Sequence, residues 1–217
     1  MCIRDRPIAV NVGKGRDTPN ESAVADYLEV MSKCKYCDYY VLNISTPNTT
    51  GVRDQQTVET VKKTLDVLTK ATPKPILVKL APDLDIDTIL DVSLAAINSG
   101  ASGLVLTNTT TDYSLLPVAE KKGGLSGRVL AKRSFEVLCA VAKEVPRGKP
   151  IISVGGIETI EDAIQRFKHR ANLIQTGTAF AVTRGPLIAN HINRKLRDFL
   201  RENEFENISE LVGYANA

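Results

Sequence analysis

Tryptophan is absent from this chain of 217 residues, and aromatic residues make up only 5% of it. The four cysteines are too few for a disulfide scaffold, so we expect a reducing compartment. No apolar run approaches the ~18 residues that a membrane-spanning helix needs. Lys and Arg exceed Asp and Glu only slightly (28 against 25) and form no basic stripe, so we expect no nucleic-acid partner.

The few residues that could ligate a metal or act as a base are poorly placed for either role. Cys34 and Cys37 form a C-x-x-C motif, but no second such motif and no nearby histidine pair accompanies them. We interpret the motif as packing at a helix end and predict no metal site. His169 and His191 fall in helical patterns and are expected at the surface, and Asp83 is interpreted as a loop or capping residue.

Apolar residues make up 43% of the chain, which is enough for a substantial core and excludes disorder as the main state. Short β-branched runs alternate with helical patterns. The strand-like runs span residues 8–12, 39–44, 76–80, 103–107, 151–154 and 173–176. The helical patterns span residues 21–33, 58–70, 86–97, 133–143, 160–167 and 186–200. This alternation predicts a parallel sheet with helices outside it.

Two architectures share this alternation, and periodicity alone does not choose between them. A doubly wound open sheet is complete with about six strands. A β/α barrel has about eight strands and would need two more units. The residues at the carboxyl ends of the strands favour the barrel. Polar residues or glycines stand at each strand end, namely Asn11, Asn43, Lys79, Thr107, Asn108, and the glycines after Val154 and Thr176.

Burying an unpaired amide or ammonium group costs several kcal/mol. Any one of these residues could be a hydrogen-bonded structural group, but the whole set is better explained by one polar site where the loops of a barrel converge. Glycines after consecutive late strands, at Gly155-Gly156 and Gly177-Thr178, let backbone N–H groups approach a phosphate. Lys79 is the only charge within a strand-like run, and we interpret it as a fixed cation beside an electron acceptor; a side chain that reaches solvent is the alternative.

The combination of motifs resembles the dihydroorotate dehydrogenase family, in its membrane-associated, quinone-reducing class. The resemblance runs from about Pro7 to about Phe199. It rests on Val10-Asn-Val-Gly-Lys14, Asn43-Ile-Ser-Thr-Pro-Asn-Thr49, Leu77-Val-Lys-Leu-Ala-Pro-Asp83, Thr107-Asn-Thr-Thr110, Gly123-Gly-Leu-Ser-Gly127, Val154-Gly-Gly156 and Gln175-Thr-Gly-Thr178. It implies a β/α barrel that binds FMN and oxidises dihydroorotate to orotate in pyrimidine (UMP) biosynthesis, with a quinone as the final electron acceptor.

The resemblance also implies roles for individual residues. Those expected to hold FMN are Asn11, Lys79, Thr107, Ser126, Gly127, Val154, Gly155, Gly156, Gly177 and Thr178. Those expected to bind dihydroorotate or orotate are Asn43, Asn48, Asn108 and Thr109. Thr46 would be the base that takes the C5 proton while hydride passes from C6 to the flavin, and Lys79 would offset the negative charge of the reduced flavin.

Two residues depart from the pattern of the quinone-reducing class. Thr46 stands where that class usually has Ser, and its extra methyl group is stiff about χ1. The soluble classes have Cys at this position, so the hydroxyl favours the quinone-reducing class. Gly177 stands where members of that class often carry Tyr, which removes side-chain contacts and keeps the backbone donors.

The resemblance further implies that the six units are the third to eighth of a TIM barrel whose first two strands, preceded by membrane-docking helices, are missing. We expect residues 1–6 to be extraneous or disordered and residues 7–217 to form a partial FMN-binding barrel. The full-length protein would lie at the cytoplasmic side of a membrane, with peripheral contact through the missing segment only. The 217 residues alone would be soluble or prone to aggregate, would bind FMN weakly and would turn over little.

Two alternatives remain open. One is another FMN-dependent barrel oxidoreductase, such as a tRNA-dihydrouridine synthase, although a catalytic loop cysteine and a basic RNA-binding region are lacking. The other is a non-catalytic fragment that binds a phosphate-bearing ligand. This alternative stays open because Thr46 stands where the quinone-reducing class usually has Ser.

Overall fold

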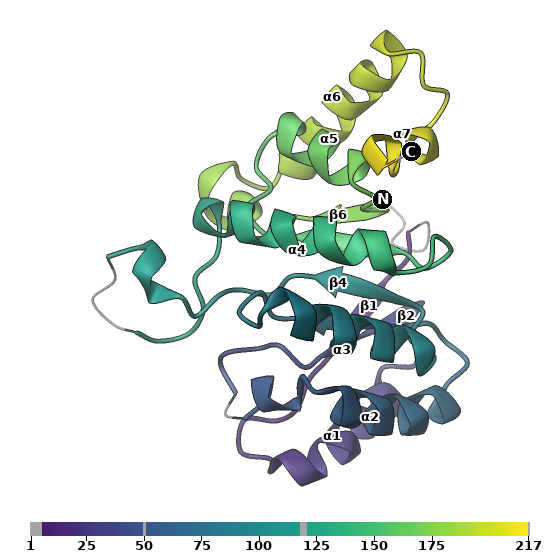
Figure 1. Cartoon of the computed structure of the whole chain (residues 1–217), viewed down its shortest axis with the longest axis vertical. Helices are drawn as coiled ribbons and strands as arrows, with labels where there is room; N and C mark the ends of the chain where they lie inside the picture. Colours follow the sequence, from purple (N-terminus) through teal and green to yellow (C-terminus); the bar gives the residue numbers. More distant parts are fainter. Residues whose placement is uncertain (1–5, 50, 118–120, 217) are drawn as a thin grey trace.

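The computed structural model describes residues 6–49, 51–117 and 121–216 (Figure 1). Six parallel strands form one sheet in the order β1 to β6. The strands are β1 (Ala9–Val12), β2 (Tyr39–Asn43), β3 (Ile76–Leu80), β4 (Gly103–Leu106), β5 (Ile151–Val154) and β6 (Leu173–Gln175). A doubly wound sheet reverses its strand order at a switch point, whereas a β/α barrel adds each strand beside the previous one. The sequential order therefore confirms the prediction of barrel-type βα units.

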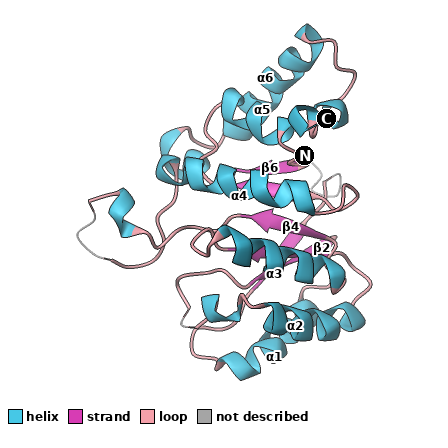
Figure 2. Ribbon diagram, viewed as in Figure 1, coloured by secondary structure: helices cyan, strands magenta, loops and turns pink. Residues whose placement is uncertain are grey.

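A helix follows each strand, as predicted (Figure 2). The helices are α1 (Ala23–Lys33), α2 (Val58–Ala71), α3 (Ile86–Asn98), α4 (Ala131–Glu144), α5 (Ile160–Lys168), α6 (Ile188–Glu202) and the short α7 (Ile208–Leu211). Side-chain oxygens cap the first turns of α2, α3 and α5, where Thr57, Asp85 and Thr159 accept hydrogen bonds from backbone N–H groups. The elements that were not predicted include α7 and the π-helical turn η6 (Ala179–Thr183). Among the described helices, none is long and apolar enough to cross a membrane.

The two faces of the sheet bury different side chains because successive residues of a strand point to opposite faces. One face packs against α1 to α4 in the main core, which includes Leu42, Val78 and Leu104. The other face carries a smaller apolar cluster of Val41, Leu77, Val105 and Ile152.

Strand register places the predicted polar residues on the face that carries the smaller cluster. Asn11 pairs with Val41, and Asn43 pairs with Lys79. Lys79 in turn pairs with Val105. The polar residues therefore share a face of the sheet with this smaller apolar cluster and lie toward the carboxyl ends of the strands.

Candidate cofactor and substrate site

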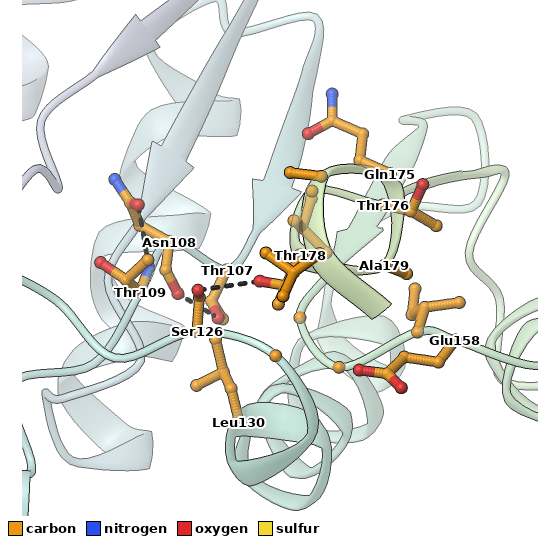
Figure 3. Close-up of a pocket in the computed structure, with 18 of the residues that line it drawn as sticks. Thr107, Asn108, Thr109, Ser126, Leu130, Glu158, Gln175, Thr176, Thr178 and Ala179 are labelled. Carbon is orange, nitrogen blue, oxygen red and sulfur yellow. Dashed lines mark hydrogen bonds between the residues drawn. The ribbon is translucent and has the colours of Figure 1, made fainter. Parts of the chain in front are cut away.

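A pocket of about 550 Å³ opens at the carboxyl ends of β3 to β6 (Figure 3). Its lining comes from segments that are far apart in the sequence and includes most of the predicted cofactor residues. Predicted residues in the lining are Lys79, Thr107, Asn108, Thr109, Ser126, Gly127, Val154, Gly155, Gly156, Gly177 and Thr178. Leu130, Glu158 and Ala179 also line it and were not predicted as site residues.

One end of the pocket is a backbone cradle formed by the glycines after β5 and β6. Gly155 and Gly156 both have positive φ angles, 121° and 67°, which a side chain would strain. A Cβ on Gly156 would approach the Cβ of Ala131 to 2.5 Å, whereas a Cβ on Gly177 would meet no atom within 4 Å. No described residue accepts a hydrogen bond from the N–H of Gly156, Gly177 or Thr178. These donors lie at the pocket without protein acceptors, which is the arrangement that a phosphate group needs.

Hydroxyl groups meet at the same cradle. The Oγ of Ser126 lies 2.8 Å from Oγ1 of Thr178, so the loop before α4 and the loop after β6 are joined there (Figure 3). Gly127 follows with a φ of 81°, and a Cβ at this position would lie 3.0 Å from Cγ2 of Thr178. The two loops can therefore approach each other closely because Gly127 has no side chain.

A buried cation, Arg166 of α5, lies under the cradle. Its guanidinium donates to the carbonyl oxygens of Gly155 (3.0 Å) and Ala131 (2.9 Å) and to the hydroxyl of Ser134 (2.9 Å). It also lies over the ring of Phe135, 5.1 Å from the ring centre. Burial lowers the pKa of Arg166 to about 10, which leaves it protonated at neutral pH. The positive charge therefore lies directly behind a loop with unpaired N–H donors.

Lys79 projects into the pocket from β3. Within the described part of the chain, its ammonium group has no hydrogen bond or ion pair. Burial lowers its pKa below the usual value of 10.5. A half-buried ammonium without a carboxylate partner favours an anionic or electron-rich ligand beside it.

A second group of polar residues joins the ends of β2 and β4. Nδ2 of Asn108 donates to Oδ1 of Asn43 (3.3 Å) and to Oγ of Ser45 (3.0 Å). Ser45 also donates to Oδ1 of Asn43 (2.9 Å). Asn108 accepts from the N–H of Thr109 (2.8 Å), which fixes the orientation of its side-chain amide. Two of the three predicted substrate amides, Asn43 and Asn108, therefore lie in contact, and the fully buried Ser45 connects them.

The remaining predicted residues lie beside this group. Oγ1 of Thr46 accepts a hydrogen bond from the N–H of Asn48 (3.3 Å). Asn48 borders the glycine-rich loop that precedes α4, because its Oδ1 lies 3.2 Å from the position of a Cβ on Gly123. Neither Thr46 nor Asn48 lines the pocket itself.

Asn11 lies on β1, apart from the pocket that holds the other predicted cofactor residues. It is exposed on β1, at the edge of the described sheet, and pairs with Val41. It does not line the pocket. Its predicted role at a flavin therefore stays a prediction.

Two buried residues of this region were missed as site residues, Ser45 and Arg166. Ser45 lies within the motif that had been singled out, but nothing in the sequence distinguishes its hydroxyl from that of Thr46. Arg166 lies in an amphipathic helix, where an arginine is usually solvated. Asp83 was expected to be a loop or capping residue; it lies in a loop, but Asp85 caps α3, and Asp83 forms an ion pair with Arg53.

The sheet order and the pocket at the strand ends define a protein of the β/α-barrel class. Residues 3–200 match the dihydroorotate dehydrogenase family, and the chain belongs to that family. Members of this family are in general flavin-dependent. The cradle fits the phosphate of a flavin nucleotide because its N–H donors are free and the space in front of Gly177 is open.

Curated relatives agree with this assignment. Dihydroorotate dehydrogenase (quinone) of Nautilia profundicola is 42% identical over 208 residues, which are 95% of this chain and 58% of that protein. The enzyme of the same name from a Nitratiruptor species is 41% identical, over 95% of this chain and 59% of that protein. The chain thus spans somewhat more than half the length of these relatives.

Solved structures show the same fold. The structure of DHODH from Eimeria tenella in complex with ferulenol superimposes with a TM-score of 0.86 at 28% identity. The superimposed residues make up 95% of this chain and 61% of the Eimeria chain. The ligand-free form of the Eimeria enzyme superimposes with a TM-score of 0.87 at 29% identity. These values confirm the prediction that the six units belong to a TIM barrel.

Proposed function

We propose that the protein oxidises dihydroorotate to orotate, with FMN as hydride acceptor and a quinone as final electron acceptor, in the de novo synthesis of UMP. The observation that carries this proposal is the convergence of a glycine cradle, an unpaired ammonium group and a pair of amides at one rim of the sheet. The names of the curated relatives support the substrate and the quinone. FMN, when bound, supplies a ring system that accepts hydride.

The cofactor half of the proposed site is the cradle. Backbone N–H groups of Gly156, Gly177 and Thr178 would bind the phosphate, and the hydroxyl of Ser126 stands beside them. The positive φ angles of Gly155 and Gly156 set the conformation of the loop after β5, so the N–H donor of Gly156 needs little reorganisation. The positive charge of Arg166 behind this loop further favours a phosphate dianion.

The substrate half is the group of amides. Asn43 and Asn108 would hold the ring and carboxylate of dihydroorotate, with Asn48 and Thr109 beside them. An amide offers both a donor and an acceptor, which suits a ring that carries N–H and C=O groups. Contact between Asn43 and Asn108 fixes the spacing of these groups before substrate arrives.

Thr46 would accept the C5 proton of the substrate at its Oγ1. Its hydroxyl is held by the N–H of Asn48 and needs a proton acceptor beyond it for net removal of the proton. Lys79 would hold positive charge beside the ring that accepts hydride, where an unpaired ammonium group would offset the negative charge of the reduced flavin.

Anaerobic reduction tests this proposal directly. Purified protein with FMN added in excess is mixed with dihydroorotate, and the visible absorbance of the flavin is recorded before and after addition of a soluble quinone. We expect loss of the absorbance with dihydroorotate and its return with the quinone. Retained FMN that dihydroorotate does not reduce would instead support a non-catalytic phosphate-ligand module.

The proposal extends to location. A quinone acceptor dissolves in the membrane, so the protein that contains this chain would work as a peripheral protein at the cytoplasmic side of a membrane. Co-sedimentation of the protein with quinone-containing vesicles checks this. Failure to bind vesicles under conditions that support quinone reduction would refute it.

A further inference from the structure

Arg53 makes polar contacts with three different loops at the rim. It lies in the short helix η3 (Arg53–Gln55), which follows β2. Its Nε donates to the carbonyl oxygen of Ser45 (3.1 Å), and Nη2 donates to the carbonyl oxygen of Thr109 (2.7 Å). Nη1 donates to Oγ1 of Thr111 (3.0 Å) and forms an ion pair with Asp83. One planar side chain thus connects the loops after β2, β3 and β4.

Asp83 extends this connection from the loop after β3. Its carboxylate accepts from the backbone N–H of Thr111 (3.0 Å) and from the hydroxyl of Thr110. Thr110 in turn pairs with Leu125, with backbone hydrogen bonds of 3.1 and 2.7 Å, so the glycine-rich loop before α4 is attached as well. Side chains of Arg53 and Asp83 are only 20% and 25% exposed, which limits competition from water.

The contacts of Arg53 adjoin the proposed substrate residues. Ser45 bonds to Asn43 and Asn108 and immediately precedes Thr46. Thr109 follows Asn108 and is itself a proposed substrate residue. The guanidinium therefore holds the backbone at two points that determine where the proposed substrate amides and the proposed base point.

We propose that Arg53 and Asp83 are a positioning pair for the substrate half of the site. The pair sets the relative position of the loops after β2, β3 and β4 without touching the substrate. This inference rests on the proposed function for the identity of the ligand. Arginine is required because its planar fork donates to several acceptors in fixed directions, whereas lysine offers a single charged centre.

A general contribution to stability is the alternative role, and Arg170 provides the matched control. Arg170 is also largely buried and donates to backbone carbonyls, of Ala142, Val145 and Pro146. These carbonyls lie at the end of α4 and in the loop that leads into β5, at the amino ends of the strands. Arg170→Lys therefore removes comparable hydrogen bonds without changing the rim.

Amide hydrogen exchange and orotate binding test the proposal together. Arg53→Lys, Asp83→Asn and Arg170→Lys are compared with the wild-type chain at equal temperature and pH. In Arg53→Lys and Asp83→Asn we expect about tenfold faster exchange at residues 45–49, 81–84 and 108–111 together, since each substitution removes hydrogen bonds of roughly 1 kcal/mol. Exchange at residues 155–158 should stay unchanged. Arg170→Lys should accelerate exchange only around residues 142–150.

Affinity for orotate, measured by calorimetry with FMN present, supplies the second readout. We expect about tenfold weaker orotate binding in Arg53→Lys and Asp83→Asn, with unchanged FMN affinity, and no change of either affinity in Arg170→Lys. Exchange that rises in one loop only, or an equal loss of orotate and FMN affinity, would overturn the proposal. If the wild-type chain does not bind orotate, the proposed function fails, and the exchange data alone decide whether the pair couples the three loops.

Discussion

The guanidinium of Arg166 donates a hydrogen bond of 3.0 Å to the carbonyl oxygen of Gly155, so a buried cation supports the loop that carries the glycine cradle. This contact accounts for how α5 helps to hold the cradle in place. The loop reverses direction at two residues with positive φ, and the same guanidinium also holds Ala131 and Ser134 at the start of α4. Arg166 therefore contributes both to the shape and to the charge of the cradle.

Arg166→Met tests this dependence. The substitution leaves the carbonyl of Gly155 without its guanidinium donor and removes the bonds to Ala131 and Ser134, so we expect the free energy of unfolding to fall by about 2–4 kcal/mol. Denaturant unfolding measures the change. Arg201→Met, at an exposed position of α6, is the control and should stay within about 0.5 kcal/mol of wild type. An equally small effect at Arg166 would contradict the assigned role.

Lys79→Met should stabilise the protein without ligand at pH 7. Burial lowers the pKa of Lys79 below 10.5, so the folded state disfavours the charged form and the unfolded state binds more protons between the lowered pKa and 10.5. Stability of the wild type should therefore rise with pH through that window, and the advantage of Lys79→Met should shrink there. Thermal unfolding across pH measures both curves. The same substitution should weaken FMN binding. A Lys79→Met protein less stable than the wild type would contradict the conclusion that the buried ammonium group of Lys79 has no partner.

Thr46 can be tested by two substitutions of graded severity. Thr46→Ser keeps the hydroxyl and removes a stiff methyl group, so we expect faster flavin reduction by dihydroorotate. Thr46→Ala removes the proton acceptor and should slow the reduction about 10²-fold or more. Anaerobic stopped-flow absorbance measures the rate in both variants. An unchanged rate in Thr46→Ala would refute the assignment of the base.

Two glycines of the cradle should differ in their tolerance of a methyl group. Gly156→Ala places a Cβ 2.5 Å from the Cβ of Ala131 at a positive φ, so we expect a loss of roughly 1–3 kcal/mol in unfolding free energy. Gly177→Ala enters open space and should change stability by less than about 0.5 kcal/mol. Chemical denaturation of the two variants compares them. Equal losses at both positions would show that the two loops do not have the described geometry.

Much of the candidate site could be predicted from the sequence, because many of its residues stand at the carboxyl ends of the strands. Parallel strands of a barrel bring their carboxyl ends to one rim, so Lys79, Asn108 and Gly156 meet without any knowledge of loop conformation. Side chains that reach the rim from elsewhere could not be found in this way. Arg166 extends from a helix, and Arg53 crosses from the loop after β2, and neither position differs from a solvated arginine in its local sequence.

Other local interpretations depended on packing that sequence patterns do not contain. The C-x-x-C motif lies at the end of α1, where the thiol of Cys37 donates to the carbonyl oxygen of Cys34 (3.3 Å). His191 is exposed, but His169 is half-buried with its ring 4.8 Å from that of Phe135. The predicted boundary at residues 1–6 is not tested, because residues 1–5 lie outside the described part of the chain.

The central claim is that residues from separate strands form one site for FMN and its substrate. We expect the 217-residue chain to retain FMN weakly, below one equivalent after dialysis, because Asn11 lies outside the pocket that holds the other cofactor residues. Titration of the isotopically labelled chain with FMN, followed by amide NMR, tests the claim most directly. We expect FMN to change the amide chemical shifts of Gly156, Gly177 and Thr178, and riboflavin, which lacks the phosphate, to leave them unchanged. Addition of orotate should then change the amide chemical shifts of Asn43 and Asn108. Shifts confined to another face of the molecule, or identical shifts with riboflavin, would contradict the claim.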